Sequence, residues 1–362
     1  MEIQEYIDTY AYVLVRIAAA KAKAVTLDDM NSLIDCSSIE SFKQALAEID
    51  EDITIDFLNS SKDLEKTLHQ VFFKYAAIII KNSPRECQEF MVKYMQKYEV
   101  ENLKDIVVAK LVSLDSRSIR EGIYYQVEDM LKTTKNLENA LNAENLDELI
   151  YWYRKTPYHG ILHEIQDRYN KTHEIFFVYA FLDKFYIDDF NLLLDQHSRW
   201  NLGAGKIIKF FVGKFTDFYN LSTTIRAIDY NFTWDELELL LSIHETERLV
   251  SKQAIKELFS IGPNIHGLAR KLKEIVKTYQ LSQNLTGIIT EERLIHSLKN
   301  FYFCLYRAFT RSLKFKQDHE LCDVIMFIIK KEIEIDNLVI IFEGIKNNYE
   351  RKELKKYIIQ EI

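Results

Sequence analysis

Apolar residues recur at intervals of three and four positions along much of the chain, a period typical of amphipathic α-helices. Residues 64–79 and 294–308 carry especially regular stripes. Such a stripe can also lie on a membrane surface or in a partner's groove, but a chain with many stripes buries them against one another. The pattern therefore predicts an all-α protein with these stripes in its core. The stripe residues are Leu64, Leu68, Val71, Phe72, Tyr75, Ile78 and Ile79, and Leu294, Leu298, Phe301, Leu305 and Ala308.

Two short segments, Thr26–Asp29 and Thr233–Glu236, have the sequence of a capping box and predict helix starts. The threonine hydroxyl can accept a hydrogen bond from a backbone N–H, and the acid three residues later can accept one from the threonine N–H. Replacing either threonine by alanine should cost about 1 kcal/mol. Pro157 and Pro263 each precede a renewed helical pattern and are predicted to mark connections between helices.

An Asn-Leu pair recurs at almost equal intervals. Asn102, Asn220 and Asn337 lie 118 and then 117 residues apart, and a leucine follows each of them. A large apolar residue stands two positions before each asparagine and another stands five positions after it, so the three segments have similar helix faces. A short polar connection and a new helix start follow each time. We therefore divide the chain into three related helical repeats, residues 1–115, 116–233 and 234–362.

Two weaker similarities agree with this repetition. Residues 155–160 (KTPYHG) and 261–267 (IGPNIHG) both contain a proline followed by His-Gly, although the first repeat has no such segment. Residues 10–34 read like a fourth, opening copy of the join between helices. Three copies of one unit predict a pseudo-threefold arrangement or a short solenoid.

The composition favours long, rarely interrupted helices. The 362 residues include only 9 glycines and 3 prolines, far fewer than sheets and loop-rich folds normally use. The 21 tyrosines and 22 phenylalanines would suit strands, but they recur with helical spacing. A hydrophobic content of 48% is sufficient for an extensive core.

The charges exclude some classes of partner. The formal net charge is −8, and lysines and glutamates are interspersed, so no basic stripe is available for nucleic acid or for anionic lipid. No apolar run approaches the roughly 20 residues that span a bilayer, and residues 175–182 (IFFVYAFL) are typical of the longest. Any membrane location would therefore require a protein partner.

The N-terminal segment and the cysteines point to the cytoplasm. Glu2, Glu5 and Asp8 precede the first apolar stretch, unlike the positive start of a signal peptide. The four cysteines are far apart and form no CxxC pair, so neither a zinc site nor a disulfide framework is expected. They are Cys36, Cys87, Cys304 and Cys322.

Two segments invite a functional interpretation, which their surroundings weaken. His159 and His163 have the four-residue spacing of zinc ligands on a helix, but no third ligand is indicated, and His266 at the matching place has no second histidine. Gly203-Ala-Gly205-Lys206 has the Gly-Lys pair of a phosphate-binding loop. However, Trp200 and Asn201 stand upstream, where a glycine is needed, and Ile207 follows the lysine. We predict the start of a helix at the first segment and a helix connection at the second.

The acids near Glu174 and the recurring asparagines have a structural interpretation as well. Carboxylates can perform acid-base chemistry or bind cations, but on an acidic helical protein they usually form a solvated face. These acids are Asp183, Asp188, Asp189 and Asp195. The three asparagines are expected to bond neighbouring backbone groups and not to contact a partner. No catalytic, cofactor-binding or metal-binding residue is assigned, no cofactor is expected, and interface residues are left open.

Several segments, taken in order, resemble a known family. Residues 10–17 (YAYVLVRI) with Thr26–Asp29, residues 100–106 (VENLKDI), and residues 334–341 (EIDNLVII) with Gly344 carry the resemblance. They resemble the C subunit of the archaeal and bacterial A/V-type ATPases, the relative of the d subunit in the eukaryotic vacuolar enzyme. The resemblance covers essentially the whole chain and depends on length, order and repetition together. Thr-Pro-Tyr of the second repeat becomes Gly-Pro-Asn in the third and is absent from the first, which weakens the internal repetition locally and not the overall resemblance.

The resemblance implies three similar helical domains in a pseudo-threefold arrangement, which form a funnel at the cytoplasmic end of a membrane rotor ring. The implied function is that of a non-catalytic central-stalk subunit, present once per complex and peripheral to the cytoplasmic face of the membrane. It would join the shaft of the D and F subunits to the proteolipid (c/K) ring and so couple ATP hydrolysis or synthesis to proton or sodium transport. The residues alone also allow a soluble helical-repeat scaffold that binds other proteins and, more distantly, an all-helical metal hydrolase.

Overall fold

The computed structural model describes residues 3–50, 53, 60–112, 114, 116–196, 202–243, 250–279, 281–282, 284–313 and 319–359. Within these ranges the chain forms eighteen α-helices, one 3₁₀ turn at Thr286–Ile288 and no β-strand, which confirms the predicted all-α class. The chain packs into two compact units. Residues 1–88 and 264–362 form the terminal unit, and residues 89–263 form the middle unit.

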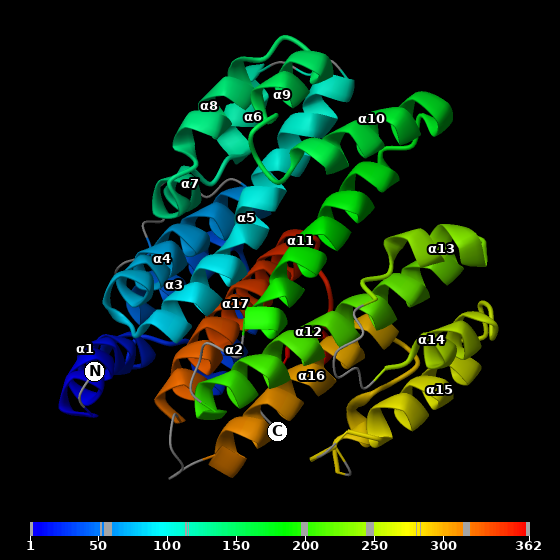
Figure 1. The fold of residues 1–362 in the computed structure, drawn as a ribbon. Helices are drawn as coiled ribbons and strands as arrows, with labels where there is room; N and C mark the ends of the chain where they lie inside the picture. Colours follow the sequence, from blue (N-terminus) through cyan, green and yellow to red (C-terminus); the bar gives the residue numbers. More distant parts are fainter. Residues whose placement is uncertain are drawn as a thin grey trace. The chain divides into compact units, whose positions relative to one another are not determined.

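The terminal unit is built around α17, which packs against α1, α2, α3, α4, α16 and α18 (Figure 1). Many of the apolar side chains of α17 are buried, including Phe327, Leu338 and Phe342. The stripe predicted for residues 64–79 lies on α4, where Leu64, Leu68 and Phe72 are buried. The helices of this unit are α1 (Ile3–Lys21), α2 (Leu27–Ile34), α3 (Ile39–Ile49), α4 (Ser61–Asn82), α15 (Ile265–Lys277), α16 (Leu294–Leu313), α17 (His319–Lys346) and α18 (Arg351–Tyr357).

One glycine allows the last helix to approach α17. A methyl group on Gly344 would overlap the side chain of Leu354, which is buried on α18. Any larger residue would push α18 away, because packed interiors have no spare volume. Ala109 and Ala227, seven positions after Asn102 and Asn220, are the small residues at the corresponding places.

In the middle unit α11 and α12 lie side by side, with α10 against α11 and with α13 and α14 against α12 (Figure 1). Aromatic rings join α5 to this pair, since the ring centroid of Phe190 lies 5.7 Å from that of Phe90 and 5.6 Å from that of Phe215. The helices are α5 (Arg85–Leu111), which begins in the terminal unit, α6 (Ser116–Gly122), α7 (Tyr125–Leu131), α8 (Thr134–Asn142), α9 (Leu146–Trp152), α10 (His159–Thr172), α11 (Phe176–Gln196), α12 (Leu202–Asp229), α13 (Trp234–Leu240) and α14 (Lys252–Phe259).

The predicted helix starts are confirmed. Thr26 and Thr233 form complete capping boxes with Asp29 and Glu236 at the first turns of α2 and α13. Pro157 lies just before α10, and Pro263 lies just before α15. In the described ranges, no helix is both long enough and apolar enough to cross a membrane.

Candidate functional site

Three long helices end in the same way. The helices α5, α12 and α17 have 27, 28 and 28 residues, and each is followed by a helix of seven residues, α6, α13 or α18. At each end a backbone N–H donates to the C=O five residues earlier, as in a Schellman motif. These bonds run from Leu114 to Ala109, from Phe232 to Ala227 and from Tyr349 to Gly344, with N···O distances of 2.9, 2.9 and 2.8 Å. We call each long helix with its short successor a join, and number the joins in chain order.

In every join, one asparagine side chain bonds the main chain of the residue 22 positions later. Its Oδ1 accepts from that residue's N–H at 2.8, 3.0 and 3.0 Å, and its Nδ2 donates to the same residue's C=O at 3.3, 2.9 and 3.0 Å. The pairs are Asn102 with Tyr124, Asn220 with Ser242 and Asn337 with Ile359. We call this arrangement the asparagine clamp. It confirms that the three asparagines bond neighbouring backbone groups.

The clamp holds the segment after the short helix against the long helix. The three asparagines are almost completely buried, with 2%, 2% and 0% of their surface exposed. A buried backbone group without a partner costs about 1–3 kcal/mol, and an apolar side chain at the asparagine would leave two such groups. Only a side chain with both an acceptor and a donor in one plane satisfies this place, which explains why the same residue type recurs.

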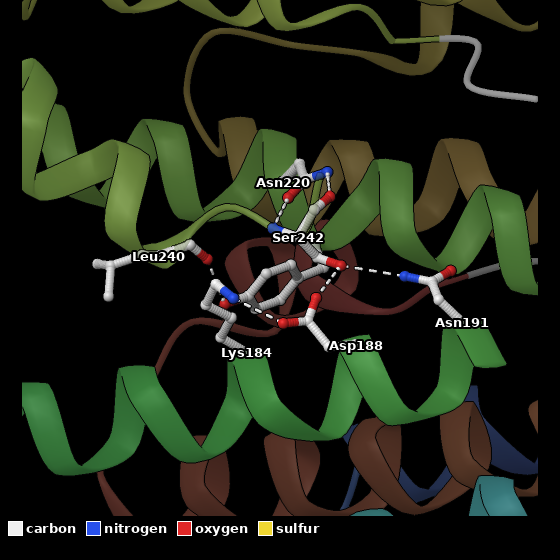
Figure 2. Close-up of polar contacts among 7 residues, drawn as sticks. Lys184, Asp188, Asn191, Asn220, Leu240 and Ser242 are labelled. Carbon is white, nitrogen blue, oxygen red and sulfur yellow. Dashed lines mark hydrogen bonds and ion pairs between the residues drawn. The ribbon is translucent and has the colours of Figure 1, made fainter. Parts of the chain in front are cut away.

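Figure 2 shows that the second clamp belongs to a wider polar network. The Oγ of Ser242 donates to Oδ1 of Asp188 at 2.6 Å and accepts from Nδ2 of Asn191 at 3.0 Å. The other oxygen of Asp188 accepts from Nζ of Lys184 at 2.6 Å. Beside the clamp, the hydroxyl of Tyr219 donates to the C=O of Leu240 at 2.8 Å. Side chains of α11 and α12 therefore fix the segment that follows α13.

Buried ion pairs accompany the second and third clamps. Lys214 Nζ lies 2.7 Å from Asp217 Oδ2, with side chains 4% and 5% exposed, and Lys331 Nζ lies 2.8 Å from Glu334 Oε1. Burial lowers the pKa of Lys214 and raises the pKa of Glu334, and the partner charge opposes each shift. Breaking such a pair is costly because one charge stays behind uncompensated.

The first clamp has a different polar neighbourhood. Glu99 accepts from the hydroxyl of Tyr158 at 2.7 Å, and Glu128 accepts from Nδ2 of Asn102 at 2.8 Å and from Oγ1 of Thr133 at 2.6 Å. Both carboxyls are buried. Burial, strengthened by the neighbouring carboxylate of Glu128, raises the pKa of Glu99 to about 7, and burial raises that of Glu128 as well.

The acid beside each clamp was missed in the sequence prediction. Glu99, Asp217 and Glu334 each stand three residues before the clamp asparagine, and this spacing is visible in the sequence. The signal was available as an acid followed two positions later by a polar or aromatic residue and then by Asn-Leu. It escapes notice because a single acid on a helix is ordinarily solvent-exposed.

The histidines that suggested zinc do not gather further ligands. His163 Nε2 lies 3.2 Å from His159 Nε2, and α10 begins at His159, as the sequence predicted. The third histidine of the pattern, His266, has its Nδ1 2.5 Å from Oε2 of Glu291 and is largely exposed. Across the described ranges, no group of three or more histidine, cysteine or acidic side chains is placed to hold a metal ion.

The glycine-lysine segment is helical. Gly203, Gly205 and Lys206 lie in the first turn of α12 and not in the connection that precedes it, so the predicted position is wrong by a few residues. The N–H groups of a first helical turn are available to an anion, but the upstream glycine and the Ser or Thr after the lysine that a phosphate-binding loop needs are absent from the sequence here. Trp200 and Asn201 lie outside the described residues.

The acids of α11 form ion pairs. The predicted solvated face is wrong for Asp189, whose side chain is 18% exposed and lies 2.5 Å from Lys93 Nζ. Asp183 and Asp188 are partly exposed, and each bonds a lysine, Lys104 or Lys184. Lysines of α5 and α11 lie next to these carboxylates and neutralise their negative charge. Glu174 is exposed, as expected, and the side chain of Asp195 is outside the described part of the chain.

None of the four cysteines forms a disulfide. Burial raises the pKa of the Cys87 and Cys322 thiols to about 12 in both cases, so neither is a nucleophile at neutral pH. The polar groups described above hold helices against one another. The joins are the arrangement of such groups that recurs along the chain.

Comparison with known proteins identifies the family of this chain. Residues 13–357 match the family described as ATP synthase (C/AC39) subunit. A relative from Methanocaldococcus jannaschii, named as the C subunit of an A-type ATP synthase, is 23% identical over 97% of this chain and 86% of its own length. Relatives of the same name from Methanothermobacter thermautotrophicus and Desulfurococcus sp. are 20% and 21% identical over 92% and 96% of this chain, and over 83% and 90% of their own lengths. The chain therefore belongs to the ATP synthase C/AC39 subunit family.

Proposed function

We propose that this chain is the non-catalytic central-stalk subunit of an A/V-type rotary ATPase. In this role one copy of the chain joins the rotor shaft of the D and F subunits to the proteolipid (c/K) ring. Torque then passes through it between ATP hydrolysis or synthesis and the transport of protons or sodium. The chain would lie on the cytoplasmic face of the membrane and be held there by its partners.

The observation that carries this proposal is the family match over residues 13–357. The relatives named as C subunits of A-type ATP synthases align over nearly their whole length, so the likeness is not confined to one module that other proteins could share. Their name assigns them to an ATP synthase, and the proposal carries that assignment to this chain.

The proposed arrangement is three helical repeats, residues 1–115, 116–233 and 234–362, around a pseudo-threefold axis that forms a funnel. The three joins support it, because they share a long helix, a seven-residue helix and a clamp with the same 22-residue spacing. The opening pair of helices, α1 and α2, has a capping box at Thr26 like that at Thr233. Val13, which is fully buried, stands thirteen residues before Thr26, as Asn220 does before Thr233.

A torque-transmitting subunit must resist bending, and the chain has the features this requires. Helices whose ends are tied back by side chains deform less than open loops, because local unfolding must break buried bonds. The Schellman bonds lie at the ends of the long helices, and the clamps lie farther back along the same helices, with a buried ion pair one turn before the second and third clamps. A catalytic group is not needed for this role.

The test is to remove the chain from cells that carry the whole ATPase and to measure both halves of the reaction in membrane vesicles. We expect ATP hydrolysis by the remaining catalytic subunits to continue, while ATP-driven ion uptake is lost and is restored by adding the chain back. A tagged copy should also co-purify with the A, B, D and F subunits and the proteolipid from mild detergent. Recovery of a cytosolic complex without ATPase subunits, with ion uptake unchanged, would favour the soluble scaffold instead.

A further inference from the structure

The acid three residues before each clamp has a lysine partner in two joins and not in the first. Lys214 and Lys331 stand one turn before Asp217 and Glu334 and form the buried ion pairs. The corresponding residue of the first join is Gln96, one turn before Glu99. Glu99 is therefore a buried acid whose repeat-related cation is replaced by a neutral amide.

The amide of Gln96 does not take over the lysine's role. Its buried Oε1 has no hydrogen-bond partner within the described part of the chain, and a neutral amide brings no positive charge to Glu99, whichever way it is turned. The charged groups that act most on Glu99 are Glu128 on α7 and Asp189 on α11, and both are negative. Lys93, a cation of the same helix, is already bonded to Asp189. The charges that act on Glu99 therefore disfavour its ionised form.

The neighbouring tyrosines do not supply a charge either. Burial raises the pKa of Tyr158, as well as that of Tyr153, so both rings stay neutral. The Tyr158 hydroxyl donates to Oε2 of Glu99 at 2.7 Å, which leaves the second carboxyl oxygen of Glu99 to be satisfied. The Thr133 side chain lowers the pKa of Glu99, but burial raises it by more.

Hydrogen-bond donors are unevenly shared between the two buried carboxyls. Glu128 accepts from Thr133 Oγ1 at 2.6 Å and from Asn102 Nδ2 at 2.8 Å, so each of its oxygens has a donor. A hydroxyl has one hydrogen, and Thr133 donates it to Glu128. Glu99 accepts from the Tyr158 hydroxyl on Oε2 and has no partner cation among the described residues, so an ionised Glu99 is the less compensated of the two.

We propose that Glu99 is a proton-binding site, in which one proton takes the place of the lysine found at the other two joins. On release the proton passes to the solvent and leaves Glu99 ionised under the influence of the acids Glu128 and Asp189. Repulsion then acts between α5 and the first turn of α7. This reaches the first clamp, whose Asn102 Nδ2 already lies closer to Glu128 (2.8 Å) than to the C=O of Tyr124 (3.3 Å).

The test measures the carboxyl resonances of the full-length chain by ¹³C NMR after labelling glutamate at Cδ, over a pH series from about 4 to 9. Glu99→Gln identifies the Glu99 signal by its loss. Gln96→Lys restores the lysine of the other joins, and Gln96→Met is the matched control, which removes the amide without adding charge. We expect the wild-type signal to titrate near pH 7, far from the ordinary range near 4.3.

The variants separate the cause. Gln96→Lys should move the Glu99 midpoint down by at least one pH unit, a tenfold or greater fall in proton affinity, whereas Gln96→Met should leave it near the wild-type value. A wild-type midpoint below about 5 would overturn the proposal, and so would an equal midpoint in the wild-type and Gln96→Lys chains. Because no partner subunit is needed, neither result depends on the proposed role in an ATPase.

Discussion

Replacing Asn220 by alanine removes the second clamp and should destabilise the middle unit. The change deletes the acceptor of the Ser242 N–H and the donor to the Ser242 C=O, which bond Asn220 at 3.0 and 2.9 Å. Ser242 is fully buried, so water does not reach these groups without local opening. Two orphaned groups at about 1–3 kcal/mol each predict a loss of about 2–6 kcal/mol, and we expect about 3 kcal/mol after partial relaxation.

The size of the effect sets the assay. For a unit of this length, about 3 kcal/mol corresponds to a fall of about 6–12 °C in the apparent Tm of the middle unit. Hydrogen exchange read by mass spectrometry adds position, because the Ser242 amide is protected by the Asn220 oxygen. Peptides covering residues 237–243 should exchange faster in Asn220→Ala while peptides of α17 in the terminal unit keep their protection.

Two further variants isolate the clamp from general damage. Asn220→Asp keeps an acceptor for the Ser242 N–H but turns a carboxylate toward the Ser242 C=O, so it should be at least as harmful as alanine. Asn170→Ala changes an exposed asparagine on α10 of the same unit and should shift stability by no more than about 0.5 kcal/mol. If Asn220→Ala and Asn170→Ala have the same Tm and the same exchange at residue 242, the clamp contributes nothing and the reasoning fails.

Four other outcomes follow from the same contacts. Lys214→Met removes the cation that lies 2.7 Å from the buried Asp217 carboxylate and should cost about 3–5 kcal/mol in urea denaturation, and adding Asp217→Leu should recover much of the loss; an unchanged midpoint in Lys214→Met would contradict this. Thr233→Ala should cost about 1 kcal/mol, with Thr233→Ser nearly neutral as its control. The Cys87 thiol should resist a disulfide reagent at pH 8 until denaturant is added, since burial raises its pKa to about 12, and prompt modification of the folded chain would refute its burial. The pKa of Glu99 is raised from 4.5 to about 7, so protonated Glu99 contributes to the free energy of unfolding fully below pH 4.5, and this contribution of about 3 kcal/mol is lost as the pH rises through 7. Scanning calorimetry from pH 5 to 8 should show the loss of stability in the wild-type chain and not in Glu99→Gln.

The helices themselves follow from the sequence because their signals are local. The stripe on residues 64–79 and the capping boxes at Thr26 and Thr233 depend on residues within a few turns of one another, and the structure places all of them as predicted. The role of the three asparagines was also predictable, since a short polar side chain on an apolar helix face must find a backbone partner. Their partner was not, because a separation of 22 residues depends on how the short helix folds back.

The polar groups of the middle unit were harder to anticipate for the same reason. Asp189 looks like a surface acid in the sequence, and only the packing of α5 on α11 brings Lys93 to it. Glu99 looks equally ordinary until α7 and the segment before α10 close over it. In both cases the environment is made by elements distant in the chain, and a pattern within one helix has no information about them.

The comparison among joins also bears on why the buried acid is there. A buried ion pair is weak evidence for stability, because well-packed apolar residues of the same volume often do as well. If the acid were present only to pair with its lysine, loss of the lysine at Gln96 would favour loss of the acid too. Glu99 is nevertheless an acid, and it bonds Tyr158, just as Glu334 also accepts a bond from the backbone of Val25 at the connection between α1 and α2. The carboxyl therefore serves to attach the long helix to the element beside it, and the lysine or the proton serves to neutralise the charge that this attachment leaves in the core.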